Sequence, residues 1–344
     1  MTIQIIDPLT DSRWSDLAAR HPRATAFHQT GWLKALADTY GYRPIALTSA
    51  SAGEPLRDGM VLCHIASWIT GHRLVSLPFA DHCEPLLDGP AALEDFVIRL
   101  RQERILQRCK YLELRLRTDF QDAHGLQQSD SYWFHELDVT PPLERIFKAL
   151  HKDSIQRKIR RAEKEQLVYE AGRSELLAEE FYRLLLVTRK RHQLPPQPRI
   201  WFSTLVNCMG DGIRIRVARK NGVAIAAMLT LRHRAGVIYK YGCSDAAFHQ
   251  LGGMPFLFWK LIKESHATGA ETIDFGRSSL TNNGLVAFKD KFGTAKTLLK
   301  YYRDPSVKTK DEAYRDSSTT RQIFSILPDA LMSLAGRMLY RHIG

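Results

Sequence analysis

A chain of 344 residues is too long for one ordinary hydrophobic core, so two domains are expected. Hydrophobic residues make up 44% of the chain and charged residues 25%, a balance typical of a soluble globular protein. The excess of 49 Lys and Arg over 37 Asp and Glu gives a formal net charge of +12. Such a charge attracts RNA, nucleotide phosphates or anionic lipid, unless it only makes a basic surface with no dedicated partner.

The cysteines and the first residues give expectations about the compartment. The cysteines are odd in number and lack C-x-x-C spacing, so we expect reduced thiols in a cytosolic protein, with neither a disulfide framework nor a metal site. They are Cys63, Cys83, Cys109, Cys208 and Cys243. Residues 1–7 contain no basic region and no long apolar core, so a signal peptide is not expected.

The first part of the chain is typical of an α/β domain. Apolar side chains at helical spacing predict a helix over residues 27–40, and another is expected over 91–109. Short apolar or alternating runs, punctuated by glycine, predict strands at 44–48, 60–66, 74–79 and 111–116. We expect this N-terminal domain to occupy residues 1–140.

A second domain is expected over residues 141–303. Pro141 and Pro142 begin a helix, and further helices are predicted at 157–164, 175–192, 199–208 and 254–266. Hairpin turns join three predicted strands, at 213–219, 223–232 and 236–243. Two more strands follow, one ending at 274–278 and one at 297–302. The sheets of both domains are expected to be mixed, largely antiparallel and flanked by helices.

The chain ends in a polar linker, residues 304–322, and an amphipathic helix, residues 323–344. Leu327, Leu331 and Met338 belong to an apolar stripe at helical spacing, with Arg337 and Arg341 between its members. The segment is too short and too charged to span a bilayer. It either lies on a membrane surface or packs on its own protein.

The most informative stretch runs from Tyr239 to Gly293. It contains a strand ending in Tyr-Lys-Tyr-Gly at 239–242, then Gln-Leu-Gly-Gly at 250–253 ahead of a helix. Asp-Phe-Gly-Arg-Ser at 274–278 ends a strand, and Phe-Lys-Asp-Lys-Phe-Gly closes the stretch at 288–293. Glycines at a strand end and a helix start predict backbone amides held close to an anionic ligand.

These pieces, in this order and spacing, resemble the FemABX and BioF2-like branch of the GNAT acyltransferase superfamily. The basic helix at 157–164 resembles the helix that opens the family's second domain, and residues 29–32 resemble its N-terminal helix. The likeness covers roughly residues 27–303. It implies two tandem GNAT-like domains, with the end of the chain returning to the first domain.

An N-acyl transfer sets modest chemical demands. An amine attacks a thioester or ester, so it must first lose a proton; an α-amine titrates near 7.7–8.0, whereas a lysine-type amine near 10.4 costs about 4–5 kcal/mol at pH 7. The oxyanion then needs donors already in place. No covalent intermediate is required, and the sequence has no G-x-S-x-G, H-E-x-x-H or G-x-x-x-x-G-K-[ST] motif.

The resemblance suggests which residues carry this chemistry. It places Lys289, of the Phe288–Lys289 pair, near the donor's reacting end or an acceptor phosphate, where its charge steadies a phosphate or the oxyanion; the alternative is a solvated surface lysine. It also places the Pro-Phe-x-Asp segment containing Asp81 along the acceptor cleft. Asp81 or His82 is then a candidate for accepting the amine proton, although a lone Asp–His pair is also typical of a turn.

The remaining candidates are donor-binding or substrate-binding residues. Arg277 suits a bidentate contact with phosphate or carboxylate beside Gly276, or an ion pair at a strand-end turn. The loop 250–253 lies where GNAT enzymes bind pyrophosphate, but it has one residue fewer than the family motif, so an ordinary loop stays an alternative. The further residues in this group are Tyr239, Tyr241, Gln250, Gly252, Gly253, Asp274, Ser278 and Phe288.

The basic helix is a separate candidate. Arg157, Arg160, Arg161 and Lys164 recur at a spacing of three to four, so they share one face. That face suits RNA backbone or a lipid-linked pyrophosphate, or it is simply solvated.

We therefore predict an N-acyltransferase or aminoacyltransferase. The resemblance implies acyl-CoA or aminoacyl-tRNA as donor, and an amine of a cell-envelope precursor (peptidoglycan or exopolysaccharide) as acceptor, with tRNA as a partner in the second case. It further implies a cytoplasmic protein with peripheral contact at the inner membrane. The alternative is a non-catalytic RNA- or membrane-binding module with a degenerate GNAT fold.

Overall fold

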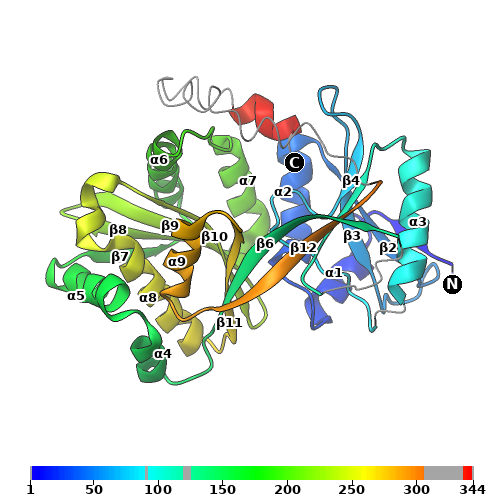
Figure 1. Cartoon of the computed structure of the whole chain (residues 1–344). Helices are drawn as coiled ribbons and strands as arrows, with labels where there is room; N and C mark the ends of the chain where they lie inside the picture. The colour runs from blue at the N-terminus through cyan, green and yellow to red at the C-terminus, as the bar shows by residue number, and fades with distance from the viewer. Residues whose placement is uncertain (1, 90–91, 119–124, 306–335, 343–344) are drawn as a thin grey trace. The chain divides into compact units, whose positions relative to one another are not determined.

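The computed structural model describes residues 2–89, 92–118, 125–305 and 336–342. The described chain forms two compact units (Figure 1). The first unit holds residues 2–132, 298–305 and 337–342, and the second holds residues 133–297 and Gly336. The chain passes from one unit to the other within two strands, β6 (Gln127–Asp138) and β12 (Ala295–Asp304).

The first unit is a mixed sheet with helices. Its strands lie in the order β1-β2-β3-β4-β5-β12, in which β4 and β5 are parallel and the other printed neighbours antiparallel. The strands are β1 (Gln4–Ile6), β2 (Arg43–Thr48), β3 (Met60–Ile65), β4 (Arg73–Val75) and β5 (Leu112–Leu116). The helices are α1 (Ser12–Arg20), α2 (Thr30–Tyr40) and α3 (Leu93–Leu106).

Two predicted elements of this unit are shorter than the sequence pattern indicates. The helix expected from residue 27 begins at Thr30, because Thr25 caps a separate 3₁₀ turn over Ala26–His28. The strand expected at 74–79 ends at Val75, because the chain turns and Phe79 adopts a φ of +61°. The guanidinium of Arg115 donates to the carbonyl oxygens of Leu77 (3.2 Å) and Ala80 (3.0 Å), which holds this turn in place.

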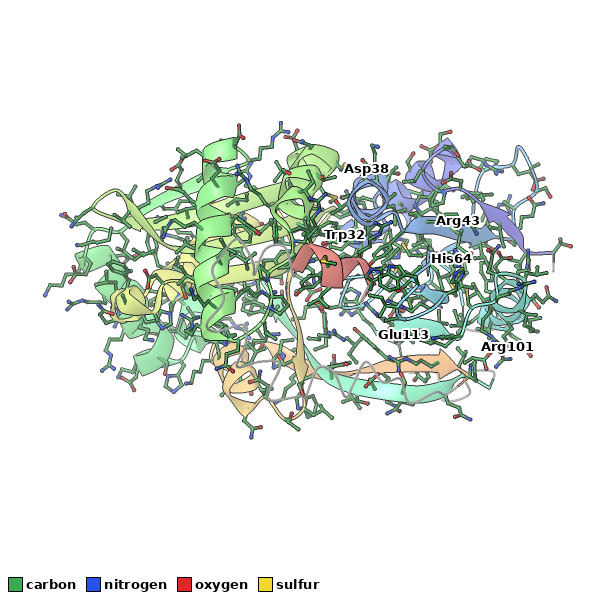
Figure 2. All side chains as sticks on the ribbon, turned by 90° about the horizontal axis from the view of Figure 1, so that it is seen from above. Trp32, Asp38, Arg43, His64, Arg101 and Glu113 are labelled. Atoms are coloured by element: carbon green, nitrogen blue, oxygen red, sulfur yellow. The ribbon has the colours of Figure 1, made fainter. Side chains whose placement is uncertain are left out.

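A buried ion cluster crosses the first unit's sheet. Glu113 on β5 is almost fully buried and accepts from Arg115 Nε (2.8 Å) and from Arg303 Nε (2.7 Å); Figure 2 labels its position. Burial alone would raise the pKa of the Glu113 carboxyl, but the charges of Arg115 and Arg303 lower it to about 2. This carboxylate is therefore ionised and ties β5 to β12.

The second unit contains the elements that resemble a GNAT domain. Its strands lie in the order β6-β11-β10-β9-β8-β7, with β7 to β10 antiparallel and β10 parallel to β11. They are β7 (Val168–Gly172), β8 (Ile213–Lys220), β9 (Val223–His233), β10 (Gly236–Ser244) and β11 (Thr272–Ser279). The helices are α4 (Leu143–Ala149), α5 (Arg157–Lys164), α6 (Glu175–Arg191), α7 (Arg199–Met209), α8 (Gly253–Ala267) and α9 (Asn283–Asp290).

Local sequence explains most of this unit. Asn221 and Gly222 take positive φ angles of 50° and 80° between β8 and β9, as a tight hairpin turn requires. The buried face of α8, including Phe258 and Leu261, packs with β-strand residues such as Ile273 in one apolar cluster. Two predictions are thereby confirmed: the α/β fold class and the mixed, largely antiparallel sheets flanked by helices.

The end of the chain is described only in part. The predicted linker 304–322 beyond residue 305, and the predicted helix 323–344 apart from residues 336–342, lie outside the described residues. The described part is helical (red in Figure 1). Tyr42 Oη donates to the Tyr340 carbonyl (2.7 Å), and Arg73 Nη2 donates to the His342 carbonyl (2.7 Å). Among the helices of the described residues, none is long and apolar enough to cross a bilayer.

Candidate active site

Two parallel strands of the second unit separate part way along their length. β10 and β11 pair at Gly236–Thr272, Val237–Ile273 and Ile238–Asp274, and the register ends there. At the next residues β10 also has a bulge, because Tyr239 pairs with Thr230 and Tyr241 with Leu229, which leaves Lys240 as an extra residue. Beyond the separation, backbone groups of β10 on the β11 side are released from the ladder and are available to a ligand.

Lys289 fixes the path of β11 at this point. Gly276 has a φ of +72°, which bends the strand, and the Asp274 carboxylate accepts a hydrogen bond from the Gly276 amide. Lys289 Nζ, on α9, donates to the carbonyl oxygens of Gly276 (2.8 Å) and Arg277 (2.9 Å). Because Lys289 is only 3% exposed, this ammonium is a buried support for the bent strand and not a solvated surface charge.

A histidine lies next to this lysine. His135 on β6 is fully buried, and its Nε2 lies 3.2 Å from Asp290 Oδ1. Burial, and then the charge of Lys289, lower the pKa of His135, so its imidazole is neutral. Ser278 is also buried, and its Oγ forms no hydrogen bond within the described part of the chain.

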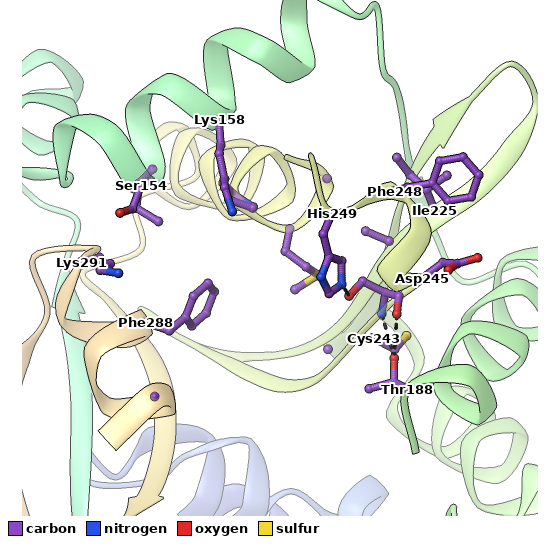
Figure 3. Close-up of a pocket in the computed structure, with 18 of the residues that line it drawn as sticks. Ser154, Lys158, Thr188, Ile225, Cys243, Asp245, Phe248, His249, Phe288 and Lys291 are labelled. Atoms are coloured by element: carbon purple, nitrogen blue, oxygen red, sulfur yellow. Dashed lines mark hydrogen bonds between the residues drawn. The ribbon is translucent and has the colours of Figure 1, made fainter. Parts of the chain in front are cut away.

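A pocket of about 580 Å³ lies alongside the released part of β10. Tyr239, Gly242, Cys243 and Ser244 of β10 line one wall. Other walls come from the start of α5, the end of α6, the start of α8 and the helix α9. Figure 3 shows Lys158, His249, Phe288 and Lys291 arranged around this pocket.

The N-terminus of α8 forms part of the wall. Gly253, Met254 and Pro255 belong to its first turn and line the pocket, so the amides of Gly253 and Met254 come from a turn whose N–H groups have no intrahelical acceptor. Gly252, with a φ of +77°, precedes them, and a Cβ there would overlap the Lys158 carbonyl. A Cβ on Gly253 would come 2.9 Å from Ala226 Cβ. These glycines therefore allow α8 to begin tight against α5 and β9, with its positive dipole end at the pocket.

The charged side chains around the pocket are mostly cationic. Four cations line it, against two carboxylates, Asp153 and Asp245. The cations come from three separate parts of the unit and are Arg157, Lys158, Arg191 and Lys291. Together with the helix dipole, this surplus favours an anionic ligand.

A hydrogen-bonded group closes one side of the pocket (Figure 3). Ser244 Oγ lies 2.9 Å from His249 Nε2, and Arg191 Nη1 lies 3.3 Å from the same nitrogen. Arg191 also donates to the Ser244 carbonyl (3.2 Å), and Thr188 Oγ1 accepts from the Ser244 amide (2.9 Å). Burial lowers the pKa of His249, and the charges of Arg191 and Lys158 lower it further, so the neutral imidazole accepts from Arg191.

The predicted donor-binding residues divide into three groups. Four line the pocket: Tyr239, Gly253, Phe288 and Arg157. Five, Asp274, Gly276, Arg277, Ser278 and Lys289, gather at the bent part of β11 and do not line it. Five others, Tyr241, Gln250, Gly252, Arg160 and Arg161, also lie outside the lining.

Tyr241 faces away from the pocket, for a physical reason. Residues two apart on a regular strand share a face, but the extra residue Lys240 places Tyr239 and Tyr241 on opposite faces. Tyr239 packs on Phe258, whereas Tyr241 accepts from Trp201 Nε1 (3.1 Å) in the core beside α6 and α7. The expectation that both tyrosines meet the donor is corrected accordingly.

The basic helix also divides. Arg157 and Lys158 line the pocket at the N-terminal end of α5. Arg160 lies over the ring of Phe147 (5.8 Å to the centroid), and Arg161 pairs with Glu165 (2.6 Å) on the surface. The shared basic face is therefore not a single binding surface at the pocket.

The predicted proton acceptors belong to the first unit. His82 is 1% exposed, and its ring contacts that of Phe27 (centroids 5.7 Å apart). Asp81 is partly exposed, and its carbonyl accepts from Tyr301 Oη (2.6 Å). Glu84 is buried and accepts from Thr118 Oγ1 (3.0 Å). His82 is thus a core residue, and only Asp81 presents a side chain to solvent.

Several pocket residues escaped sequence reasoning. Arg191 and His192 end a long helix, Ser244 ends a strand, and His249 and Lys291 lie in or beside short turns. None belongs to a motif of its own. The usable signal was that Ser244 directly follows the aromatic strand and that Lys291 lies two residues after Lys289.

Comparison with known proteins supports this description. A family model described as "Acetyltransferase (GNAT) domain" matches residues 150–289. No curated protein sequence matches the chain.

Solved structures match almost the whole chain in fold. FemX has a TM-score of 0.71 at 12% identity, covering 92% of this chain and 99% of that one. The C-terminal domain of a putative lysylphosphatidylglycerol synthetase from Agrobacterium fabrum has a TM-score of 0.57 at 13% identity, covering 94% and 95%. A tandem GNAT protein from the clavulanic acid biosynthesis pathway has a TM-score of 0.53 at 14% identity, covering 88% and 98%.

The parted strands, the pocket at a helix N-terminus and the family match over the same residues agree with one another. Residues 150–289 are a GNAT acyltransferase domain, and the chain as a whole has the fold of the FemABX-like branch.

Proposed function

We propose that the chain transfers an acyl or aminoacyl group from a phosphate-bearing carrier to an amine, and that the second unit's pocket binds the carrier. The observation that supports this most directly is the separation of β10 from β11 after Ile238 and Asp274, beside a pocket with a surplus of cations. Acyl-CoA and aminoacyl-tRNA are the two carriers with this chemistry.

The proposed binding mode follows from the groups that line the pocket. Phosphates of the carrier lie against the α8 N-terminus and the cations Arg157, Lys158 and Arg191. The part of the carrier next to the acyl group lies along β10, where released backbone groups at Tyr239 to Gly242 pair with it. Phe288 and Tyr239 supply apolar contact for the arm.

The proposed reaction is a direct transfer. The neutral amine attacks the carbonyl carbon of the thioester or ester, the tetrahedral oxyanion forms, and the carbon–sulfur or carbon–oxygen bond to the carrier breaks. The amine proton leaves with the departing thiol or hydroxyl or passes to a base, so no enzyme nucleophile is consumed. Backbone N–H groups near the strand separation stabilise the oxyanion, and Lys289 acts as a positioning residue that holds the bent backbone of Gly276 and Arg277.

For the acceptor we propose an amine on a cell-envelope or exopolysaccharide precursor. The support is the structural likeness to FemX and to the lysylphosphatidylglycerol synthetase domain, whose name joins a lysyl group to a membrane lipid. Asp81, the partly exposed carboxylate of the first unit, is proposed as the residue that binds or deprotonates this amine.

Binding of each carrier tests the donor site. Acetyl-CoA and a charged tRNA are titrated against the wild type and against Lys158→Ala and Arg157→Ala, with Lys164→Ala as the matched control, because Lys164 is on the same helix but outside the pocket. We expect each pocket variant to weaken the true carrier about tenfold and the control to leave its affinity unchanged.

The salt dependence then separates the carriers. Affinity for tRNA should fall steeply with salt on a logarithmic plot, in proportion to the phosphates contacted, whereas affinity for acetyl-CoA should fall with a shallow slope. Mass spectrometry of pooled acyl-CoAs and charged tRNAs shows which is consumed. Consumption of neither pool, or equal binding by all three variants, contradicts the proposal.

A further inference from the structure

The first unit has a second surface whose chemistry the acyl-transfer site does not use. Five exposed apolar side chains, here called the apolar patch, are Trp68, Ile69, Ile105, Leu106 and Met338. Four of them, with exposures of 63% to 86%, are the most exposed large apolar side chains among the described residues. Exposed aromatic and aliphatic groups at this density mark an interaction surface.

Three segments bring these side chains to one edge of the sheet. β4 and β5 are parallel, with Leu74 opposite Leu112, so the loop before β4 and the turn before β5 lie at the same edge. Lys110 joins the two: its backbone amide donates to the His72 carbonyl (2.8 Å) and its Nζ to the Thr70 carbonyl (2.9 Å).

The third segment is the helical stretch 336–342. The ring of His342 contacts that of Trp68, with centroids 5.6 Å apart, and its carbonyl accepts from Thr70 Oγ1 (2.9 Å). Met338 lies one helical turn before His342. The loop itself is firmly held, because Ser67 Oγ accepts from the amides of Ile69 (3.2 Å) and Thr70 (2.9 Å). Trp68 is therefore presented to solvent from an ordered turn.

The charge around the apolar patch is of one sign. Residues 64–75, 104–112 and 336–342 contain no aspartate or glutamate. Four exposed cations accompany the apolar side chains in these segments: Arg108, Lys110, Arg337 and Arg341. A protein partner or a second copy of this chain would bring no matching excess of negative charge, since the chain itself carries +12. An anionic lipid surface brings both an apolar layer and the opposite charge.

We propose that this edge of the first unit binds the surface of an anionic phospholipid bilayer. Trp68 and Ile69 enter the headgroup region, where an indole ring is favoured because it offers an apolar body and a polar N–H. Ile105, Leu106 and Met338 widen the inserted area, and the four cations contact lipid phosphates. The contact is peripheral and rests on described segments that the pocket does not include.

Vesicle binding of the full chain tests this. Wild-type protein is sedimented with phosphatidylcholine vesicles that contain or lack phosphatidylglycerol. We expect binding to need the anionic lipid, to fall about tenfold or more in Trp68→Ser/Ile69→Ser, and to fall about fivefold for each cation removed in Arg337→Gln/Arg341→Gln. Leu176→Ser, which changes an equally exposed leucine on α6, is the matched control and should bind like the wild type.

Two further readings make the result decisive. Thermal unfolding of each variant should match the wild type, because the changed side chains are exposed. Unchanged vesicle binding by Trp68→Ser/Ile69→Ser, or equal binding to vesicles without anionic lipid, overturns the proposal. So does concentration-dependent self-association that requires Trp68 in a protein that binds no vesicles, because the patch then joins two copies of the chain.

Discussion

Lys289 Nζ lies 2.8 Å from the carbonyl oxygen of Gly276, and this contact holds β11 where it bends. The lysine comes from α9 and the glycine from β11, so a buried charge on a short helix supports the strand next to the pocket. The sequence already suggested that both residues belong to one site. The structure assigns them different parts in it: the glycine bends the strand, and the lysine secures the bend.

Lys289→Met should therefore destabilise the fold as well as slow transfer. The substitution leaves the carbonyls of Gly276 and Arg277 without their charged donor in a buried place. We expect a loss of about 2–4 kcal/mol in the free energy of unfolding, measured with urea, and a lower kcat.

Lys291→Met is the matched control, because Lys291 lines the pocket but has no such buried contact in the described structure. It should keep its unfolding free energy within about 0.5 kcal/mol and bind the donor more weakly. Equal stability of the two variants would show that Lys289 supports nothing.

Gly242→Ala should disturb the pocket through its neighbour. A Cβ at Gly242 would overlap the Tyr239 hydroxyl, so the tyrosine must leave its place beside β10. We expect the unfolding free energy to fall by about 1–3 kcal/mol and donor affinity to fall with it. Most of the loss should vanish in a Tyr239→Ala background. Gly236→Ala, on the same strand with no atom nearer than 3.6 Å, is the control.

Tyr241→Phe should affect stability alone. The hydroxyl accepts from Trp201 Nε1 in the buried side of the sheet opposite the pocket. Removing it should cost about 1 kcal/mol in urea unfolding and leave donor affinity as it is. A weaker donor affinity in a stably folded Tyr241→Phe variant would return this residue to the binding site.

Glu113 should give the first unit a distinct acid sensitivity. Its pKa in the fold, about 2, lies below the unfolded value near 4.5, so its contribution is complete above about pH 5 and is lost as the pH falls toward 2. The shift corresponds to about 3 kcal/mol. The stability difference between wild type and Glu113→Gln should be largest at pH 7 and shrink below pH 5. Parallel stability profiles for the two proteins would contradict this.

Elements with strong local determinants could be predicted from the sequence. The strands β8, β9 and β10 were predicted to within two residues, because their tight turns and apolar runs are local properties. α8 was predicted for the same reason. β6 and α9 were not assigned: β6 is largely polar and half-exposed, and α9 is only 8 residues long.

The site was predictable only as far as its motifs reached. A bulge of one residue at Lys240 decides which of two tyrosines faces the pocket, and no spacing rule reveals it. Burial separates Lys289 from Lys291, although both are lysines on adjacent turns of sequence. Arg191 joins Lys158 at the pocket only through tertiary packing.

The start of α8 and the carbonyl of Lys158 approach too closely to admit even a methyl group at Gly252. Two walls of the donor pocket consequently behave as one solid piece, and neither can swing away from the other to widen the entrance. Any adjustment between a slim carrier arm and a bulky one must come from the opposite banks, α9 and the final turn of α6. Carrier choice is thus decided by the mobility of those two helices, while α5 and α8 supply a fixed anvil of positive charge.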